Sequence, residues 1–247
     1  MNLFAIGKAL FFCHFLTVST LICFALKEEA APFRKIARAK AGISILITGI
    51  GRQNAEKSVR EFLATHSPEL VLTCGFAGGL NPDLKLGDVV FEFIPGSSRR
   101  ESAQIRTGEK LEPTDVGCYE KLVAAGAKPV KFFCADRIAT TVAEKQVLRT
   151  QTGADAVEME SAVIHAVCRE RGVACATVRV ISDTANEDLP LDFNALAKPD
   201  RSIDFAKLAW AIAKSPGKIG ALMALQKKTS FAARQLADVL EKIIVQP

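Results

Sequence analysis

The chain has 247 residues, of which 49% are hydrophobic and 24% are charged, and its formal net charge is +5. A chain of this length buries one large core, and α/β folds of this size commonly form a single domain. Lysine and arginine are spread along the chain and do not cluster with aromatic residues, which argues against nucleic-acid binding. The seven cysteines are odd in number and lack C-x-x-C spacing, a pattern that favours a reduced, cytoplasmic setting.

The N-terminal segment allows more than one interpretation. Residues 1–26 are largely apolar, as in a signal peptide or a membrane anchor. Three hydroxyl residues between positions 17 and 20 interrupt the apolar run, and no clean A-x-A cleavage site follows it. We therefore expect residues 1–16 to be an extension, residues 17–247 to form the domain, and the protein to be cytoplasmic with no membrane partner.

Four apolar runs predict buried strands that end in glycine or acidic residues. They lie at residues 20–26, 44–48, 70–72 and 173–181. The first run is followed by Glu28 and Glu29, and the second by a Gly-Ile-Gly-Arg turn. Helical spacing at 55–64 and 160–171 places helices between strands. Since ligands of parallel α/β sheets bind at the carboxyl ends of strands, the pattern predicts one α/β domain with its site there.

A glycine-rich segment at residues 73–80 follows the third apolar run. Gly75, Gly78 and Gly79 allow the backbone to bend sharply and to come close to a ligand. We expect a glycine-rich turn here, before Gly87 and Asp88 lead into another strand. A tight, hairpin-like connection that binds nothing would have the same composition.

Acidic residues begin the predicted helix at 160–171. A carboxylate at Glu158 or Glu160 accepts hydrogen bonds only, so it suits a vicinal diol such as ribose. The alternative is that both are first-turn acids that match the helix dipole. Asp183 follows the strand at 173–181 and is therefore predicted at the edge of the sheet where ligands bind.

The C-terminal part offers less chemistry. Residues 186–200 form a polar, proline-bearing connection that is either a lid or an ordinary surface loop. Beyond it, amphipathic helices are predicted at 205–214, 218–228 and 231–245. The three histidines are far apart and lack metal-ligand spacing, so neither a metal nor a cofactor is predicted.

Four segments together resemble the signature segments of the purine nucleoside phosphorylase and nucleosidase superfamily. They are G-F-A-G-G-L at 75–80, G-D-V-V at 87–90, V-E-M-E at 157–160 and R-V-I-S-D at 179–183. Within this superfamily they are most similar to the 5′-methylthioadenosine/S-adenosylhomocysteine nucleosidases. The resemblance implies a single-domain, three-layer α/β sandwich, in which helices flank a central mixed, largely parallel twisted sheet. It also implies a homodimer or a larger homo-oligomer.

The resemblance also implies roles for four residues. Asp183 matches the acid that donates a proton or a hydrogen bond to purine N7. Glu29 falls where nucleosidases place the carboxylate that orients and deprotonates the attacking water. Glu160 matches the residue that binds the ribose hydroxyls, and Arg179 one that holds the water or the sugar. N-ribosyl bonds break through an oxocarbenium-like state, which carboxylates beside the sugar and an acid beside the base both favour.

Further contacts to the substrate are implied around these four residues. Met159 matches an apolar contact to the sugar, and Ser182 supports the Asp183 carboxylate. Ile138 is a candidate base contact, although ordinary strand packing explains it equally well. The expected set is completed by Glu158, Phe76, Ala77 and Gly78. Phe76 departs from the family, whose small hydroxyl residue at this position helps to hold water.

We therefore expect a purine nucleosidase that hydrolyses an adenine nucleoside, such as 5′-methylthioadenosine or S-adenosylhomocysteine, and releases adenine. A phosphate-dependent phosphorylase is the first alternative. Glu29 favours water as the nucleophile, and Arg52 is the one arginine on a nearby glycine turn, so no phosphate clamp is evident. A non-catalytic nucleoside-binding protein, in which Phe76 displaces the nucleophile, is the second alternative.

Overall fold

A computed structural model of the chain describes residues 20–93, 113–198, 205–215 and 217–245. The predicted extension at 1–16 lies outside these residues. The strands are β1 (Thr20–Phe24), β2 (Ile43–Ile47), β3 (Leu70–Gly79), β4 (Val89–Phe93), β5 (Lys128–Pro129), β6 (Phe132–Cys134), β7 (Ala156–Glu158) and β8 (Ala174–Asp183). The helices are α1 (Lys27–Ala37), α2 (Arg52–Leu63), α3 (Pro113–Ala124), α4 (Val142–Thr152), α5 (Ser161–Arg171), α6 (Phe205–Lys214) and α7 (Lys218–Val245).

The strands of the described residues form one mixed sheet in the order β2-β1-β3-β8-β4-β5. The pairs β1–β2, β1–β3 and β3–β8 are parallel, whereas β4 runs antiparallel to β8. The short β7 pairs antiparallel with the end of β3 and carries β6 beside it. The predicted fold class, a mostly parallel sheet flanked by helices in a single domain, is confirmed.

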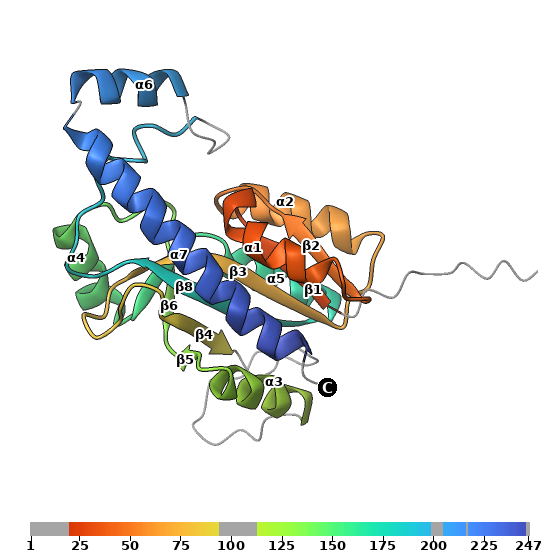
Figure 1. Cartoon of the computed structure of the whole chain (residues 1–247). Helices are drawn as coiled ribbons and strands as arrows, with labels where there is room; N and C mark the ends of the chain where they lie inside the picture. The colour runs from red at the N-terminus through yellow and green to blue at the C-terminus, as the bar shows by residue number, and fades with distance from the viewer. Residues whose placement is uncertain (1–19, 94–112, 199–204, 216, 246–247) are drawn as a thin grey trace, which may run out of the picture.

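Alternate side chains of the central strands face two different helix layers, as the pleat of a strand requires. On β1, Ile22 and Phe24 pack in a cluster with α1 and α7, whereas Leu21 and Cys23 pack with α2 and α5. Figure 1 shows the long helix α7 crossing the sheet. Because both faces are covered, functional side chains reach solvent at the strand ends.

The glycine-rich segment does not form the predicted turn. β3 continues through it to Gly79, because its last residues stay paired with β8 on one side and with β7 on the other. The strand is distorted instead: Gly75 has a φ of 146°, and the register with β8 shifts between Ala77 and Gly78. The glycines therefore reshape a central strand and do not end it.

The two separate helices predicted at 218–228 and 231–245 are also wrong, because α7 is continuous from Lys218 to Val245. The Thr229 hydroxyl donates to the carbonyl oxygens of Leu225 and Gln226 one turn earlier, so it is accommodated within the helix. The part of α7 after Thr229 packs against the sheet, where Leu236 and Leu240 are buried. Among the described residues, no helix is both long and apolar enough to cross a membrane.

Candidate active site

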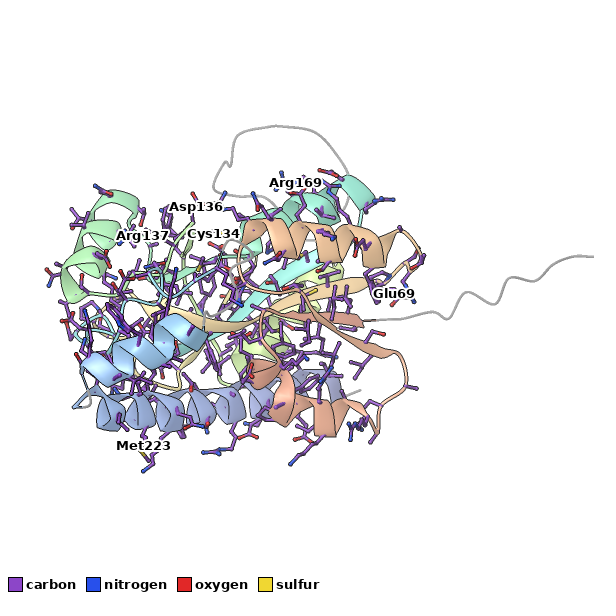
Figure 2. All side chains as sticks on the ribbon, turned by 90° about the horizontal axis from the view of Figure 1, so that it is seen from above. Glu69, Cys134, Asp136, Arg137, Arg169 and Met223 are labelled. Atoms are coloured by element: carbon purple, nitrogen blue, oxygen red, sulfur yellow. The ribbon has the colours of Figure 1, made fainter. Side chains whose placement is uncertain are left out.

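The predicted catalytic residues gather at the carboxyl ends of β1, β3 and β8. In Figure 2, Glu69, just before β3, lies near the right edge of the molecule, and Cys134 and Asp136 lie left of its centre. Cys134 ends β6 and pairs with Glu158 at the end of β7. The short strands β6 and β7 thus bring the start of α5 to the edge of the sheet that the sequence predicted for ligands.

Arg179 is the central cation of the site. It lies on β8, and its side chain is 1% exposed. Nη2 donates to Glu158 Oε2 at 2.6 Å and to Thr73 Oγ1 at 3.1 Å, and it lies 3.3 Å from Glu160 Oε2. Nη1 donates to the carbonyl oxygen of Cys74, while Nε has no hydrogen-bond partner among the described residues. Burial works against the charge of Arg179, but the surrounding glutamates raise its pKa and keep it a cation.

Glu158 is committed to contacts within the protein. Oε2 accepts from the backbone N–H groups of Glu160 and Ser161, and Oε1 accepts from the Ser161 hydroxyl at 2.6 Å. Burial would raise the pKa of this carboxyl, but Arg179 and these donors outweigh it, so the pKa lies below its usual value. Glu158 therefore caps the start of α5 and orients Arg179, and its predicted contact to substrate stays a prediction.

Glu29 lies in the first turn of α1, which follows β1 closely, and it is almost fully buried. Oε1 accepts from the N–H of Phe76 at 2.9 Å, and Oε2 accepts from the N–H of Leu26 at 2.8 Å. Burial raises the pKa of Glu29 to about 7, although the N–H of Phe76 and the charge of Arg179 act in the opposite direction. Glu29 thus exchanges a proton near neutral pH, as a general base requires.

Glycine at position 75 makes the approach of Glu29 and Arg179 possible. A Cβ atom there would lie 2.7 Å from Arg179 Nη1 and 2.8 Å from Glu29 Oε1, closer than real Cβ contacts. The φ of 146° is also a backbone angle that residues other than glycine rarely adopt. Gly75 therefore brings the acid of α1 and the cation of β8 together across β3.

Glu160 connects the start of α5 to the turn before α2. Oε1 accepts from the N–H of Gly51 at 2.9 Å, and burial raises the pKa of this carboxyl. Arg52, which follows Gly51, forms an ion pair with Asp136 and donates to the carbonyl oxygen of Cys134. The N–H and the guanidinium that an anion would use at this glycine turn are thus already bound to protein groups.

Asp183, at the end of β8, is held at both oxygens. Oδ1 lies 2.8 Å from Ser182 Oγ, and Oδ2 lies 2.6 Å from the ammonium of Lys145 on α4. The Lys145 side chain is 0% exposed. Asp183 and Ser182 were predicted from the sequence but Lys145 was not, because nothing in the local pattern of α4 distinguishes this lysine from a surface residue.

The remaining predicted site residues lie around this centre. Ala77 and Gly78 are on β3, and a Cβ at Gly78 would lie 3.2 Å from Asp183 Oδ2. Met159, which stands between Glu158 and Glu160 in the sequence, is buried. Phe76 is partly buried and packs against the cluster that includes α1 and α7, while its N–H binds Glu29. No group of three or more metal-ligating side chains occurs among the described residues.

Ile138, the predicted base contact, has both of its backbone polar groups hydrogen-bonded to another residue. Its N–H donates to Asn194 Oδ1, and its carbonyl oxygen accepts from Asn194 Nδ2, both at 2.9 Å. A base contact at this position would use the partly exposed Ile138 side chain or displace Asn194. The Asn194 amide fixes the connection after β8 beside the segment that precedes α4.

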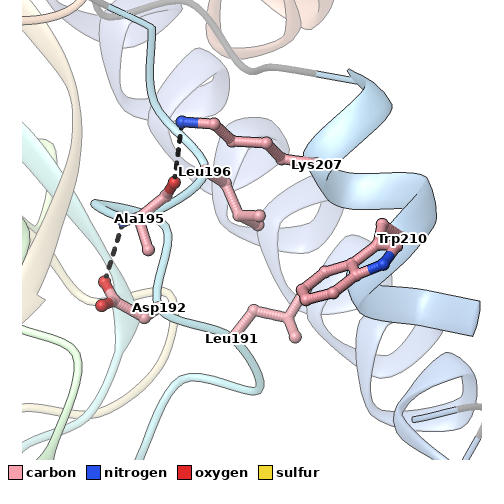
Figure 3. A pocket seen from close by; sticks show the side chains of 6 residues that line it. All are labelled: Leu191, Asp192, Ala195, Leu196, Lys207 and Trp210. Atoms are coloured by element: carbon pink, nitrogen blue, oxygen red, sulfur yellow. Dashed lines mark hydrogen bonds between the residues drawn. The ribbon is translucent and has the colours of Figure 1, made fainter. Parts of the chain in front are cut away.

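A separate apolar hollow lies further along that connection (Figure 3). It is lined by Leu191, Asp192, Ala195, Leu196, Lys207 and Trp210. Lys207 and Trp210 belong to α6, and the other four residues to the connection between β8 and α6. None of the acids at the strand ends lines it, so it is distinct from the Arg179 centre.

The amino-acid sequence of the chain is similar to those of known proteins. The family model of the phosphorylase superfamily matches residues 26–92 and 114–214. The 5′-methylthioadenosine/S-adenosylhomocysteine nucleosidase of Shewanella halifaxensis is 29% identical over 179 residues, which are 64% of this chain and 76% of that protein. The nucleosidase of the same name from Shewanella oneidensis is 29% identical over 196 residues, or 68% and 78% of the two chains.

Solved structures share the fold. Futalosine hydrolase of Helicobacter pylori has a TM-score of 0.63 at 20% identity, covering 92% of this chain and 98% of that chain. The 5′-methylthioadenosine/S-adenosylhomocysteine nucleosidase of Helicobacter pylori, in complex with butyl-thio-DADMe-Immucillin-A, has a TM-score of 0.62 at 19% identity. That match covers 92% of this chain and 97% of the other.

Proposed function

The chain belongs to the phosphorylase superfamily as an N-ribosyl hydrolase, and we propose that it releases adenine from an adenine nucleoside such as 5′-methylthioadenosine or S-adenosylhomocysteine. The observation that supports this proposal is that Glu29 and Glu160 lie around the buried Arg179 of β8, while Asp183 ends the same strand. The adenine nucleosidases among its relatives suggest the same substrate class. The geometry allows each of these residues a step in the reaction.

The reaction divides between two ends of the site. At the base, Asp183 donates a proton to purine N7 while the C1′–N9 bond breaks and its electron pair moves into the purine. At the sugar, Glu160 binds the ribose hydroxyls, and its carboxylate stabilises the positive charge that develops on the ring. Glu29 then takes a proton from the water that attacks C1′.

Water is favoured over phosphate as the nucleophile. Phosphate needs free N–H groups or cationic side chains, and the start of a helix commonly supplies them. Here Glu160 accepts the N–H of Gly51, and Arg52 is paired with Asp136. A carboxylate at this place would repel phosphate, so the turn before α2 supports hydrolysis.

Adenine release tests the proposal directly. The purified protein is incubated with 5′-methylthioadenosine, S-adenosylhomocysteine and adenosine, each with and without inorganic phosphate, and free adenine is quantified by chromatography. We expect release from at least one substrate at a rate that does not depend on phosphate. Strictly phosphate-dependent release, or no release from any of the three, would overturn the proposed hydrolysis of adenine nucleosides.

The rate should depend on pH through Glu29. Because the pKa of Glu29 is raised to about 7 and only its carboxylate accepts a proton from water, kcat/KM should decline below about pH 7. The decline should approach about tenfold for each pH unit. Steady-state kinetics between pH 5 and 9 measure it.

A neighbouring glutamate provides the control for this profile. Glu28 precedes Glu29 in the same helical turn but is exposed. The Glu28→Gln variant should keep the wild-type rate and profile, whereas Glu29→Gln should leave a slow reaction without the decline near pH 7. An unchanged profile in Glu29→Gln would exclude Glu29 as the base.

A further inference from the structure

Lys145 is a fully buried lysine whose ammonium has all of its hydrogen bonds satisfied. Nζ lies 2.6 Å from Asp183 Oδ2 and donates to the carbonyl oxygens of Thr184 at 2.7 Å and Glu187 at 2.9 Å. An ammonium has three N–H groups, so these three acceptors use its full capacity. Burying a lysine is costly unless it is paired, and Asp183 is the carboxylate with which it pairs.

The other charges near this pair are engaged elsewhere. The Glu187 carboxylate accepts from the N–H of Thr184 and pairs with Lys228 of α7. On α4, Glu144 caps the helix and pairs with Arg137. The buried ion pairs of the described residues therefore form two groups: Arg179 with Glu158 and Glu160, and Lys145 with Asp183.

Lys145 also decides which oxygen of Asp183 is available. Oδ2 is directed inward, toward the ammonium and toward Gly78 of β3. An oxygen that accepts from an ammonium at 2.6 Å is a poor place for a proton. A proton carried by Asp183 is therefore directed to Oδ1, which accepts from the Ser182 hydroxyl when Asp183 is ionised. Once Oδ1 is protonated, that hydroxyl donates to the carbonyl oxygen of Ala77 instead.

We propose that Lys145 is a positioning residue for the leaving purine, holding Asp183 so that Oδ1 delivers the proton and stabilising the carboxylate that remains after N7 has received it. The proposal rests on the proposed nucleosidase function. Before the step, Asp183 takes up a proton from water at Oδ1. That proton then passes to N7, and the electron pair of the C1′–N9 bond goes to the purine. Lys145 keeps its own proton throughout.

Lys145 also connects the acid to the chain that follows it. The carbonyl oxygens that it binds belong to the first residues after β8, and this connection lies along the start of α4. The N–H of Leu189 donates to Thr140, and the N–H of Val142 donates to Asp188. A purely structural lysine would serve this connection equally well, so the test must separate positioning of the acid from packing.

Two substrates with different leaving groups make this separation. Adenine needs a proton to depart, whereas 4-nitrophenolate leaves 4-nitrophenyl β-D-ribofuranoside without one. In Lys145→Met we expect kcat for adenine release to fall about ten- to a hundredfold with KM within about threefold, and the nitrophenyl substrate to lose less than about threefold. Lys145→Arg, which keeps the cation, should recover part of the adenine rate. The control is Lys128→Met, which removes an exposed ion pair with Asp88.

A mutant cycle keeps the proposal testable with the adenine nucleoside alone. Lys145→Met leaves a buried carboxylate unpaired, but the double variant with Asp183→Asn removes both charges and restores a matched site. If Lys145 acts through Asp183, the double variant is no slower than Asp183→Asn by itself. Additive losses, equal losses on both substrates, or an unchanged adenine rate in Lys145→Met would each overturn the role of Lys145. A wild type that releases no adenine would instead overturn the proposed function.

Discussion

Asp183→Asn is expected to lower kcat for adenine release by about a hundredfold to ten-thousandfold, the range that general acid catalysis contributes. The amide has nearly the shape of the carboxyl and still accepts a hydrogen bond from Lys145, but the buried ammonium loses its counter-charge, so the variant should also be less stable. It carries no acidic proton, and the purine must then leave as an anion. Adenine release under saturating substrate, compared with the wild type, measures the loss.

Asp83→Asn provides the matched control for this experiment. Asp83 is exposed on the connection that follows β3. The same chemical change there should leave kcat within about twofold, because substitutions on the surface, away from the core and from buried charges, have small effects. Asp183→Asn that retained more than a tenth of the wild-type rate would show that another group protonates the purine.

The sequence predicted the strands well because their signals are local. An apolar run such as 173–181 becomes a buried strand whichever neighbours it has, and the polar residues that follow it mark the edge of the sheet. Glu29 and Asp183 were found for the same reason, because each follows or ends an apolar run whose strand is parallel to β3. Glu160 was found at the start of a predicted helix, and the role of Arg179 came from the family resemblance of its segment.

The missed features depend on partners that are distant in sequence. Lys145 stands between Glu144 and Gln146 on a helix, where local patterning predicts exposure. It is buried because α4 packs at the end of β8, which places Asp183, Thr184 and Glu187 around its ammonium. The Asn194 amide on the Ile138 backbone is likewise formed by residues 56 positions apart. Periodicity carries no information about either contact.

The glycine-rich strand shows a different reason for error. Three glycines in five residues are typical of a turn, and local propensity alone predicts one. In the structure β3 is paired on both sides at Gly78, so tertiary pairing outweighs propensity. Small residues are needed there for another reason, since side chains of α1 and β8 meet across Gly75. The composition was a correct sign of close approach and a wrong sign of a turn.

Arg179→Met should lower the free energy of unfolding by about 3–5 kcal/mol, the usual cost of removing one partner from a buried ionic cluster. Glu158 and Glu160 would lose their cation, and Glu29 would lose a nearby positive charge. Urea unfolding followed by far-ultraviolet circular dichroism measures the change. Trp210, the one tryptophan of the chain, is 62% exposed on α6 and is a poor probe of this site.

The cause of that loss can be separated from the loss of packing by a second substitution. Glu158→Gln in the Arg179→Met background removes the charge of a fully buried carboxylate that has lost its cation. The amide oxygen still accepts from the N–H groups of Glu160 and Ser161. We therefore expect it to recover part of the stability. The exposed Arg169 of α5 supplies the control, and Arg169→Met should leave the unfolding midpoint nearly unchanged. If the double variant is no more stable than Arg179→Met, the arginine stabilises the site by packing, and the carboxylates at the strand ends do not depend on its charge.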